Sequence, residues 1–512
     1  MMELQHKILS VIITILLTAG VFFAGSKGLT VVEEEKEEKA WYSRSDTIYF
    51  WYYDESMTDY INKAAVDFGE KNNVHVMPML VTMDNYLEAV NNASVENNQL
   101  PDAYLLGHES LEMAYQTGLA CEINDPWNFC SDAYFSEAAL NSVTYQGKHI
   151  AYPLSYNTCA MIYNVDYLYD WAQQKALAVL KGEGEDYGGG DYFEEIDEQT
   201  SEEGTGEGTE GENTEETTDS GEEKETDPTL EVDPDLVPYD ELSEEEQVKV
   251  LRARTDENFE KATPSTLNEL LTIADSYSAP SGVDGVMSWD VTDIMFNYWI
   301  VGDVMNLGGE AGDDKKQLIL NTEKIKNCLL KYQHLHNFFN IESSLVAYDK
   351  VIQDFIDGKM MFTIASTDSV AKLAEAEKNG SLEFQYKYAL IPAVDDETDS
   401  IPMSMTEVVV INGYSEKKDI ANEFARYITG EFASELYLRT GKPACNIHAN
   451  NDYENLDVFD AEYAKSVPLP KIIELENFWM EIEAVFQRVW DGEDVDAELS
   501  ELENTVRLFF ME

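Results

Sequence analysis

The chain has 512 residues, of which 44% are hydrophobic, and it carries a formal net charge of −66 with a pI near 4.1. This length and apolar content suffice for two globular lobes with buried cores. So negative a chain repels nucleic acid and anionic membrane surfaces, and we therefore expect no nucleic-acid partner. The charge is unevenly spread, because residues 181–246 contain 28 acidic residues and 2 lysines, a net −26 that leaves −40 for the rest.

Residues 1–45 read as an export segment followed by an acidic linker. Lys7 precedes an apolar run from Ile8 to Gly25, after which Lys27 and "EEEKEEK" follow. The run is long for a signal-peptide core and short for a membrane span, so an uncleaved anchor and a cleaved signal both stay open. Both alternatives predict an extracytoplasmic chain, tethered at the cell surface or secreted. No cysteine follows the run, so a lipoprotein anchoring site is not expected.

Strands and helices are expected to alternate in the region that follows. β-branched and aromatic residues predict strands at residues 47–54, 74–81 and 101–107. Apolar residues at helical spacing predict helices at residues 56–73, 82–97 and 109–119. Such alternation favours an α/β lobe with a largely parallel sheet. Two more short strands, "HIAYPL" and "AMIYN", are joined through "SYNTC", a polar junction between apolar strands.

Residues 181–246 interrupt this pattern. The segment consists mainly of Gly, Glu, Thr and Ser and has almost no apolar residues. Because such a composition buries too little surface to offset the entropy of ordering, we predict a disordered, solvated acidic insertion. A role in cation buffering or partner tethering is the alternative interpretation.

Folded sequence resumes after the insertion. Helices are predicted at residues 263–278, 417–430, 431–441, 472–492 and 494–510, and strands at residues 386–394 and 405–413. Residues 344–376 read as helix, turn, strand and helix, and residues 285–309 are rich in aromatic side chains.

The five cysteines show no metal-ligand spacing. A Cys121–Cys130 disulfide and fully buried free cysteines both remain open, since an odd number prevents complete pairing within one chain. The stretch "DGEDVDAEL" at residues 491–499 lacks the ligand spacing of a calcium loop. We expect neither a metal nor a cofactor.

The globular part resembles the extracellular solute-binding proteins of carbohydrate ABC transporters (family 1, the maltose- and maltodextrin-binding type). The matching stretches occur in the order of the family, and together they cover roughly 400 residues. They are "YFWYYD", "LPDAYLLGHESLEMAYQTGLACEI", "YQGKHIAYPLSYNTCAMIYN", "PSTLNEL", a segment ending "LGG", "DFIDGKMMFTIAST", "YALIPAV", "RTGKPACN" and "LPKIIELENFWMEIEAVFQRVWDG". The resemblance implies an α/β, type II periplasmic-binding-protein fold, with two lobes joined by a hinge and a ligand cleft between them.

On this basis residues 46–154 and 391–447 are expected to form lobe 1, and residues 155–390 and 448–512 to form lobe 2. The insertion at residues 181–246 then lies within lobe 2, where the family has a much shorter connection. A long insertion at a surface connection costs little stability.

A sugar cleft combines aromatic rings, which pack on pyranose faces, with carboxylates, which accept from hydroxyl pairs. Tyr53, Asp54 and Glu55 end the first strand, with an ordinary helix-capping turn as the alternative. His108 and Glu109 follow the third strand. Glu109 matches a sugar-binding acid of the family, whereas His108 alone suits a structural role.

The remaining candidates lie in the crossing segment and in lobe 2. Asn157, beside Tyr156, stands where maltose-type proteins carry a carboxylate, and Asp368 stands where the family often has a stacking Trp. The Trp479 side chain matches a second stacking position, with a helix-core role as the alternative. Among the clustered residues at 289–299 some must be core, and the candidates are Trp289, Asp293 and Tyr298.

The resemblance implies a non-enzymatic receptor that captures a sugar or oligosaccharide by hinge closure and delivers it to a permease. The expected partners are the sugar and the transmembrane permease subunits, and the expected state is a monomer. A surface-anchored carbohydrate-sensing or adhesion-like protein without transport is the alternative. A glycoside hydrolase is a further alternative, since paired carboxylates arise by chance among 100 acids.

Overall fold

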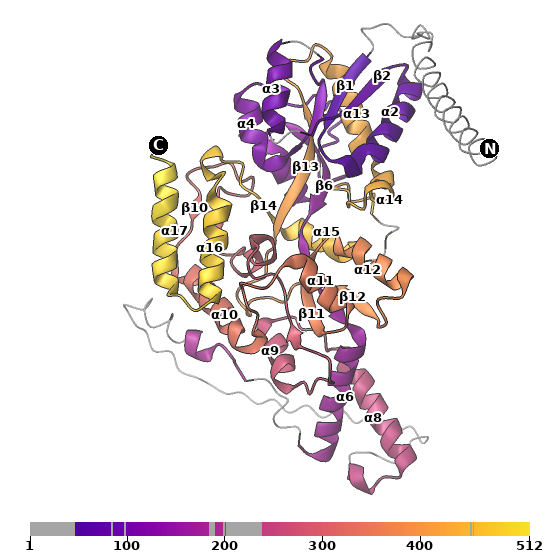
Figure 1. The fold of residues 1–512 in the computed structure, drawn as a ribbon, viewed down its shortest axis with the longest axis vertical. Coiled ribbons are helices and arrows are strands. Elements are labelled where there is room, and N and C mark those ends of the chain that lie inside the picture. The colour runs from indigo at the N-terminus through magenta and orange to yellow at the C-terminus, as the bar shows by residue number, and fades with distance from the viewer. Residues whose placement is uncertain are drawn as a thin grey trace, which may run out of the picture.

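The computed structural model describes residues 47–511 except 83–84, 97–98, 184–189, 198–199, 201–237, 451–452 and 454. The predicted export segment and most of the predicted acidic insertion lie outside these residues. No helix in the described part combines the length and apolarity needed to cross a bilayer. Two α/β lobes follow one another along the longest axis of the molecule, lobe 1 uppermost in Figure 1.

Lobe 1 is built on a six-stranded sheet with the order β14-β13-β3-β1-β2, and β6 also pairs with β13. Strands β2 and β3 run parallel to β1, and β13 runs antiparallel to β3 and β6. The strands are β1 (Thr47–Tyr52), β2 (His75–Leu80), β3 (Ala103–Gly107), β6 (Ala151–Asn157), β13 (Met403–Ile411) and β14 (Val467–Pro468). The alternation predicted for residues 47–119 is thus confirmed.

Helices cover both faces of this sheet (Figure 1). They are α2 (Thr58–Asn72), α3 (Tyr86–Glu96), α4 (Leu111–Gln116), α5 (Glu137–Val143), α13 (Lys418–Thr429) and α14 (Leu436–Thr440). The reason is visible in α2, where Tyr60, Ile61, Ala64 and Phe68 recur at helical spacing and are buried. A short hairpin, β4 (Thr144–Tyr145) and β5 (Lys148–His149), precedes β6.

Lobe 2 contains a four-stranded sheet with the order β12-β7-β11-β8. Its strands are β7 (Cys159–Asn164), β8 (Gly285–Met287), β11 (Met360–Ser366) and β12 (Tyr386–Ala389). The surrounding helices are α6 (Val165–Lys181), α8 (Glu244–Phe259), α9 (Leu267–Ser276), α10 (Glu323–Phe339), α11 (Tyr348–Ile356), α12 (Ser369–Asn379), α16 (Phe478–Trp490) and α17 (Val495–Phe509). Helices α10, α16 and α17 pack together, and a small ribbon of β9 (Asn306–Leu307) and β10 (Leu318–Ile319) lies beside them (Figure 1).

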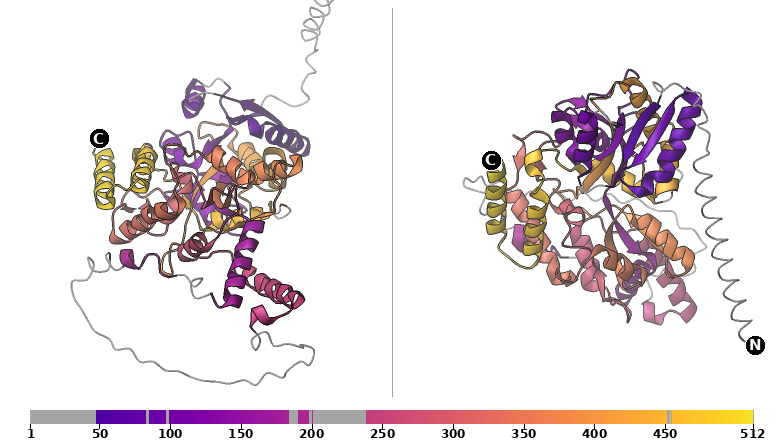
Figure 2. Two further views of the ribbon diagram at one scale, coloured as in Figure 1. Left: turned by 60° about the horizontal axis from the view of Figure 1, so that its bottom comes forward. Right: turned by 45° about the horizontal axis from the view of Figure 1, so that its top comes forward.

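The chain passes between the lobes more than once. Strand β6 belongs to the sheet of lobe 1 and ends at Asn157, beyond the expected boundary at residue 154, because residues 155–157 still pair with β13. Strand β7 begins at Cys159 in the other sheet, so Thr158 is the crossing point of this connection. The chain returns between β12 and β13, and helix α15 (Leu456–Lys465) contacts both α5 and β7. Both views of Figure 2 show the indigo N-terminal part of lobe 1 above the magenta part of lobe 2.

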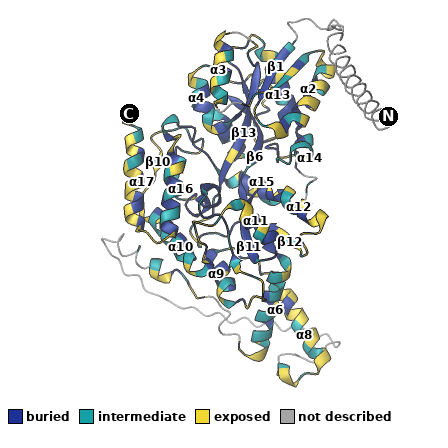
Figure 3. Ribbon diagram, viewed as in Figure 1, coloured by how far each residue is buried: buried dark blue, intermediate teal, exposed yellow. Residues whose placement is uncertain are grey.

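The predicted disorder of residues 181–246 is wrong at both edges of the insertion. Phe193 is 1% exposed and belongs to the core of lobe 2. The Asp197 carboxylate lies 2.8 Å from the buried Lys331 ammonium. At the other edge Ser243 caps α8, which packs on α6 in the part of lobe 2 remote from lobe 1 (Figure 1), while much of the outer surface of α8 is exposed (Figure 3). A small number of buried contacts is thus enough to order segments whose composition predicts disorder.

Candidate functional site

A cavity of about 860 Å³ lies between the two lobes, a volume within the usual range for small-molecule sites. Lobe 1 contributes the ends of β1, β3 and β6, the middle of β13 and the loop after α14. Lobe 2 contributes residues 293–296, the β11–α12 turn and the start of α16. The polar and aromatic lining residues are Tyr53, Glu109, Ser155, Tyr156, Asn157, Asp293, Phe296, Tyr348, Ser366, Thr367, Asp368, Thr406, Glu407, Thr440, Lys442, Trp479 and Glu483.

Glu109 and Tyr53 form one part of the lobe 1 wall. A Cβ on Gly107 would lie 2.1 Å from the Glu109 Oε1 atom, so the glycine leaves the space that this carboxylate occupies. Burial and the nearby Glu407 raise the pKa of Glu109. The ring of Tyr53 contacts Tyr86 edge to face at 5.1 Å, and Tyr53 lines the cavity.

Glu407 lies in the middle of β13, directly opposite Gly107 of β3, where the pairing with β6 shifts register. Its Oε2 atom accepts from the Ser155 hydroxyl at 3.1 Å and from the Lys442 ammonium at 3.2 Å. The Asp54 carboxylate approaches Lys442 to 2.5 Å from the other side. Burial lowers the pKa of Lys442, but Glu407 and Asp54 outweigh it and raise that pKa above its ordinary value. Lys442 is therefore a cation held between two acids.

The residues of the crossing segment mainly connect elements to one another. The Tyr156 hydroxyl donates to Asp460 at 2.6 Å, and its ring stacks on Tyr463 at a centroid distance of 4.1 Å. The Asn157 Oδ1 atom accepts from the Thr367 hydroxyl at 2.7 Å, which links β6 to the turn after β11. Both residues also line the cavity, so a change in the relative position of the lobes acts directly on its floor.

The lobe 2 wall carries a second pair of acids. Asp293 caps a short 3₁₀ helix, η6 (Ile294–Phe296), and accepts from the Met295 N–H at 2.9 Å. Glu483 projects from α16 toward the same side of the cavity. Burial raises the pKa of both carboxyls, and Asp293 adds to the shift of Glu483.

Aromatic residues complete this wall. Trp479, in the first turn of α16, is half-buried and contacts Phe478 edge to face at 5.4 Å. Tyr348 stacks on Phe296 at 4.5 Å, and both line the cavity. The Asp368 carboxylate accepts from the Tyr348 hydroxyl at 2.6 Å and pairs with Lys372 at 2.8 Å. Tyr348 thus supplies an aromatic surface next to the position where the family often has a Trp.

Seven of the twelve predicted residues line the cavity, namely Tyr53, Glu109, Tyr156, Asn157, Asp293, Asp368 and Trp479. The other five do not. Asp54 caps the 3₁₀ helix η2 (Glu55–Met57) and holds Lys442, and Glu55 is exposed outside the cavity. Trp289 and Tyr298 are both 0% exposed in the core of lobe 2, because packing within that aromatic segment takes the largest side chains inward.

His108 is also fully buried and serves a structural role. Its Nδ1 atom accepts from the Thr406 N–H at 3.0 Å, and its Nε2 atom lies 3.0 Å from the Leu469 carbonyl oxygen. Burial and the nearby Lys471 lower the pKa of His108 to about 3, so the imidazole is neutral. It therefore fixes β13 to the chain that follows β14.

Besides Phe296, which lies within the aromatic segment of residues 285–309, four lining residues that carry charge or a ring were not predicted from the sequence: Glu407, Lys442, Glu483 and Tyr348. The signal for Glu407 was an isolated acid within the apolar stretch "MTEVVVI", where a charged residue needs a partner or a function. The other three lie in helices or loops whose composition does not distinguish them from ordinary surface positions.

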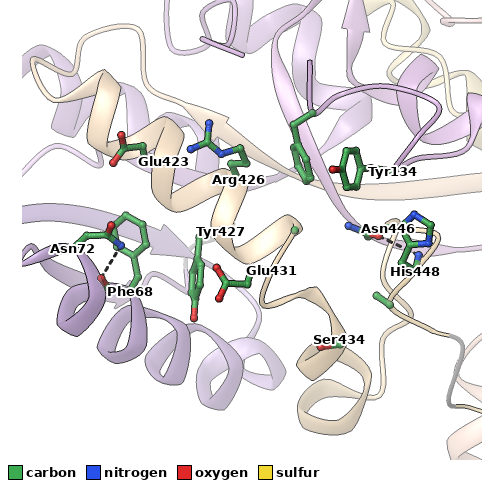
Figure 4. A pocket seen from close by; sticks show the side chains of 13 residues that line it. Phe68, Asn72, Tyr134, Glu423, Arg426, Tyr427, Glu431, Ser434, Asn446 and His448 are labelled. Carbon is green, nitrogen blue, oxygen red and sulfur yellow. Dashed lines mark hydrogen bonds between the residues drawn. The ribbon is translucent and has the colours of Figure 1, made fainter. Parts of the chain in front are cut away.

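A second hollow of about 650 Å³ lies within lobe 1, between the end of α2, the end of α13 and residues 446–449. His448 and Ala449 pack on lobe 1, beyond the expected boundary at residue 447. Figure 4 shows Arg426 and Glu423 on one side of the hollow and Tyr134 and His448 on the other. Because all its walls belong to one lobe, a ligand there makes no bridging contact between the lobes.

The described residues contain no group of three or more His, Cys, Asp or Glu side chains arranged to hold a metal ion. All five cysteines are free in the structure, and burial raises the pKa of Cys130 and Cys445. The open alternative of a Cys121–Cys130 disulfide is thus not realised here.

Two α/β lobes, crossed repeatedly by the chain and enclosing a cavity, define the type II periplasmic-binding-protein fold. The predicted fold class and the predicted resemblance are confirmed at this level by solved structures that share the fold over most of the chain. No protein-family model and no curated protein matches the sequence.

Three of these structures are sugar complexes. An extracellular solute-binding protein from Staphylococcus aureus with maltose has a TM-score of 0.65 and 16% identity, over 91% of this chain and 98% of its own. A cyclo/maltodextrin-binding protein with maltotetraose has a TM-score of 0.64 and 16% identity, over 91% of this chain and 98% of its own. The maltose-binding periplasmic protein from Listeria monocytogenes, with maltose, has a TM-score of 0.61 and 17% identity, over 91% of this chain and 97% of its own.

Proposed function

We propose that this protein is an extracytoplasmic carbohydrate-binding receptor that takes up a sugar or oligosaccharide in the cavity between its lobes. The observation that carries the proposal is the composition of that cavity, in which aromatic faces stand beside fixed carboxylates, an amide and hydroxyls. Rings and acids in one cleft match the apolar faces and the hydroxyl edges of a pyranose. The three sugar complexes with the same fold support this ligand class.

Capture would proceed by closure of the lobes about the crossing segments. Tyr53 and Glu109 belong to one wall, and Asp293 and Trp479 to the other, so only a ligand that reaches both favours the closed state. The Asn157–Thr367 hydrogen bond and the Tyr156–Asp460 hydrogen bond connect the floor to both sides of the hinge. Ligand binding would thereby change the shape that a membrane partner meets.

Delivery to the permease of an ABC transporter is the second part of the proposal, with the protein acting as a monomer that is tethered or secreted. A surface-anchored carbohydrate sensor without transport uses the same cleft and differs only in its partner. A complex with a permease that forms in the presence of sugar supports transport, and binding without any such complex supports the sensor.

Calorimetry and thermal unfolding of the purified chain against a panel of mono- and oligosaccharides test the binding function. A saturable sugar that raises the unfolding temperature and is recovered unchanged supports the receptor. Chemical turnover of the sugar would instead indicate a glycoside hydrolase. Absence of any response across the panel would contradict a carbohydrate-binding role.

A further inference from the structure

The cavity between the lobes has a marked excess of negative charge. Among the described residues five carboxylates line it, belonging to Glu109, Asp293, Asp368, Glu407 and Glu483, and Lys442 is the only lysine or arginine of this described lining. A binding site for neutral hydroxyls needs acceptors and donors but no net charge. Each of these carboxylates therefore requires a nearby cation to compensate its negative charge.

The nearby cations compensate only part of this charge. Lys442 is taken by Asp54 at 2.5 Å and Glu407 at 3.2 Å, and Lys372 neutralises Asp368 at 2.8 Å. Burial raises the pKa of Glu109 and the positive charge of Lys471 lowers it in part, but this lysine is itself buried and donates to the Asn141 and Ala311 carbonyl oxygens.

Glu109, Asp293 and Glu483 have no ion pair with a lysine or arginine among the described residues. Glu109 lies 3.8 Å from His108, but that imidazole is neutral. Three carboxylates on two facing walls are thus left without a counter-charge.

Glu407 gives an independent indication of a missing donor. The residue is 9% exposed, and its Oε1 atom is buried without a hydrogen-bond partner in the described structure. The Tyr53 hydroxyl lies close enough to Glu407 that, besides burial, the charge of this carboxylate and a side-chain hydrogen bond with it raise the pKa of Tyr53, but Oε1 has no partner at ordinary hydrogen-bond geometry among the described residues. A buried carboxylate oxygen without a donor destabilises the cleft, and a ligand that donates to it removes that cost.

We propose, resting on the receptor function above, that the cleft selects a sugar carrying a positive charge, namely an amino sugar with a free ammonium group. Closure over a neutral sugar would desolvate Glu109, Asp293 and Glu483 together without a counter-charge, which is strongly unfavourable. An ammonium on the pyranose supplies the charge and up to three N–H donors. The rings of Tyr53, Tyr348 and Trp479 pack on the sugar face and also attract a cation.

The test compares sugars that differ only at one carbon. Calorimetry of the full chain uses each 2-amino-2-deoxy hexose beside its parent hexose and its N-acetyl derivative, and chitosan oligomers beside cello-oligosaccharides and acetylated chito-oligosaccharides. The amine should bind at least tenfold more tightly than both neutral counterparts. This advantage should shrink at high ionic strength, as for any charge–charge attraction in a solvated cleft.

Variants assign the effect to the site. Glu483→Gln and, separately, Glu109→Gln should each reduce the preference for the amine over its neutral counterpart at least fivefold. Glu481→Gln, on the same helix but outside the cavity lining, removes the same charge and should leave the preference unchanged. Circular dichroism verifies that each variant folds. If one of the two variants does not fold, the other variant alone still provides the test.

Three outcomes would overturn the proposal, and each can be distinguished from the other two. A neutral sugar that binds as tightly as its amine refutes the charge selection and leaves the receptor function intact. Simple diamines that bind as well as the amino sugars refute the role of the pyranose, and with it the carbohydrate receptor. No binding of any sugar, charged or neutral, refutes both.

Discussion

The carboxyl group of Glu462 should make the stability of the protein depend on pH in a defined direction. Glu462 lies on α15 and is 0% exposed. One oxygen accepts from the Ile391 N–H at 2.6 Å, and the other lies 3.3 Å from the Lys465 ammonium. Burial raises its pKa from 4.5 to about 7, although Lys465 and the Ile391 N–H oppose the shift.

The sign follows from proton linkage. Between pH 4.5 and about 7 the folded chain binds the Glu462 proton more tightly than the unfolded chain. This contribution to stability is therefore complete below pH 4.5 and is lost as the pH rises through about 7. Because one pKa unit corresponds to about 1.4 kcal/mol, the loss amounts to about 3 kcal/mol by pH 8.

Substitution Glu462→Gln keeps an acceptor for the Ile391 N–H and removes the ionisation. Relative to the wild type, the free energy of unfolding of the variant should rise by about 2 to 3 kcal/mol between pH 5 and pH 8. Urea unfolding followed by circular dichroism at several pH values measures this difference. Asp457→Asn, an exposed acid on the same helix, is the control and should give a constant difference. A constant difference for Glu462→Gln as well would refute the burial argument.

Three further substitutions test other parts of the structure. Trp479→Ala should weaken binding of the sugar at least tenfold, which corresponds to about 1.4 kcal/mol. The control is Met480→Ala, at a neighbouring side chain that is 62% exposed, and it should leave the affinity unchanged. If calorimetry gives equal affinities for Trp479→Ala and the wild type, Trp479 is a packing residue. His108→Ala should cost about 2 to 4 kcal/mol in urea unfolding, because two buried hydrogen bonds and the ring volume are lost. Phe193→Ala should cost about 3 kcal/mol, and a loss below about 0.5 kcal/mol would show that residues 190–197 are not anchored.

The fold was predictable from the sequence largely because its elements repeat a regular pattern. Runs of β-branched and aromatic residues identified β1 to β3, and apolar residues at period 3.6 identified helices α2 to α4. The edge of the insertion was not predictable in the same way. Residues 190–197 are ordered by the buried ring of Phe193, by Tyr192 and Ile196 packed against the same core, and by the Asp197–Lys331 ion pair, and none of these produces a periodic signal.

The candidate site was predictable where it follows strand ends. Tyr53, Glu109 and Asn157 each stand at or just beyond the end of a strand and line the cavity. The aromatic segment after β8 was not resolved by the same reasoning, because a ring that packs in a core and a ring that packs on a sugar have the same composition signal. Trp289 is accordingly buried against Trp490, with ring centroids 5.2 Å apart.

Strand β13 sets the order of events when the chain folds. It completes the sheet of lobe 1 by pairing with β3 and β6, and the His108 imidazole that fixes it to β3 is 298 residues away from Thr406 in sequence. During synthesis, β3 and β6 therefore emerge long before their partner, each with the edge that meets β13 unpaired. The sheet of lobe 1 is completed only after β7 to β12 of lobe 2 have been made, so we infer slow folding and a period in which the chain depends on protection from aggregation.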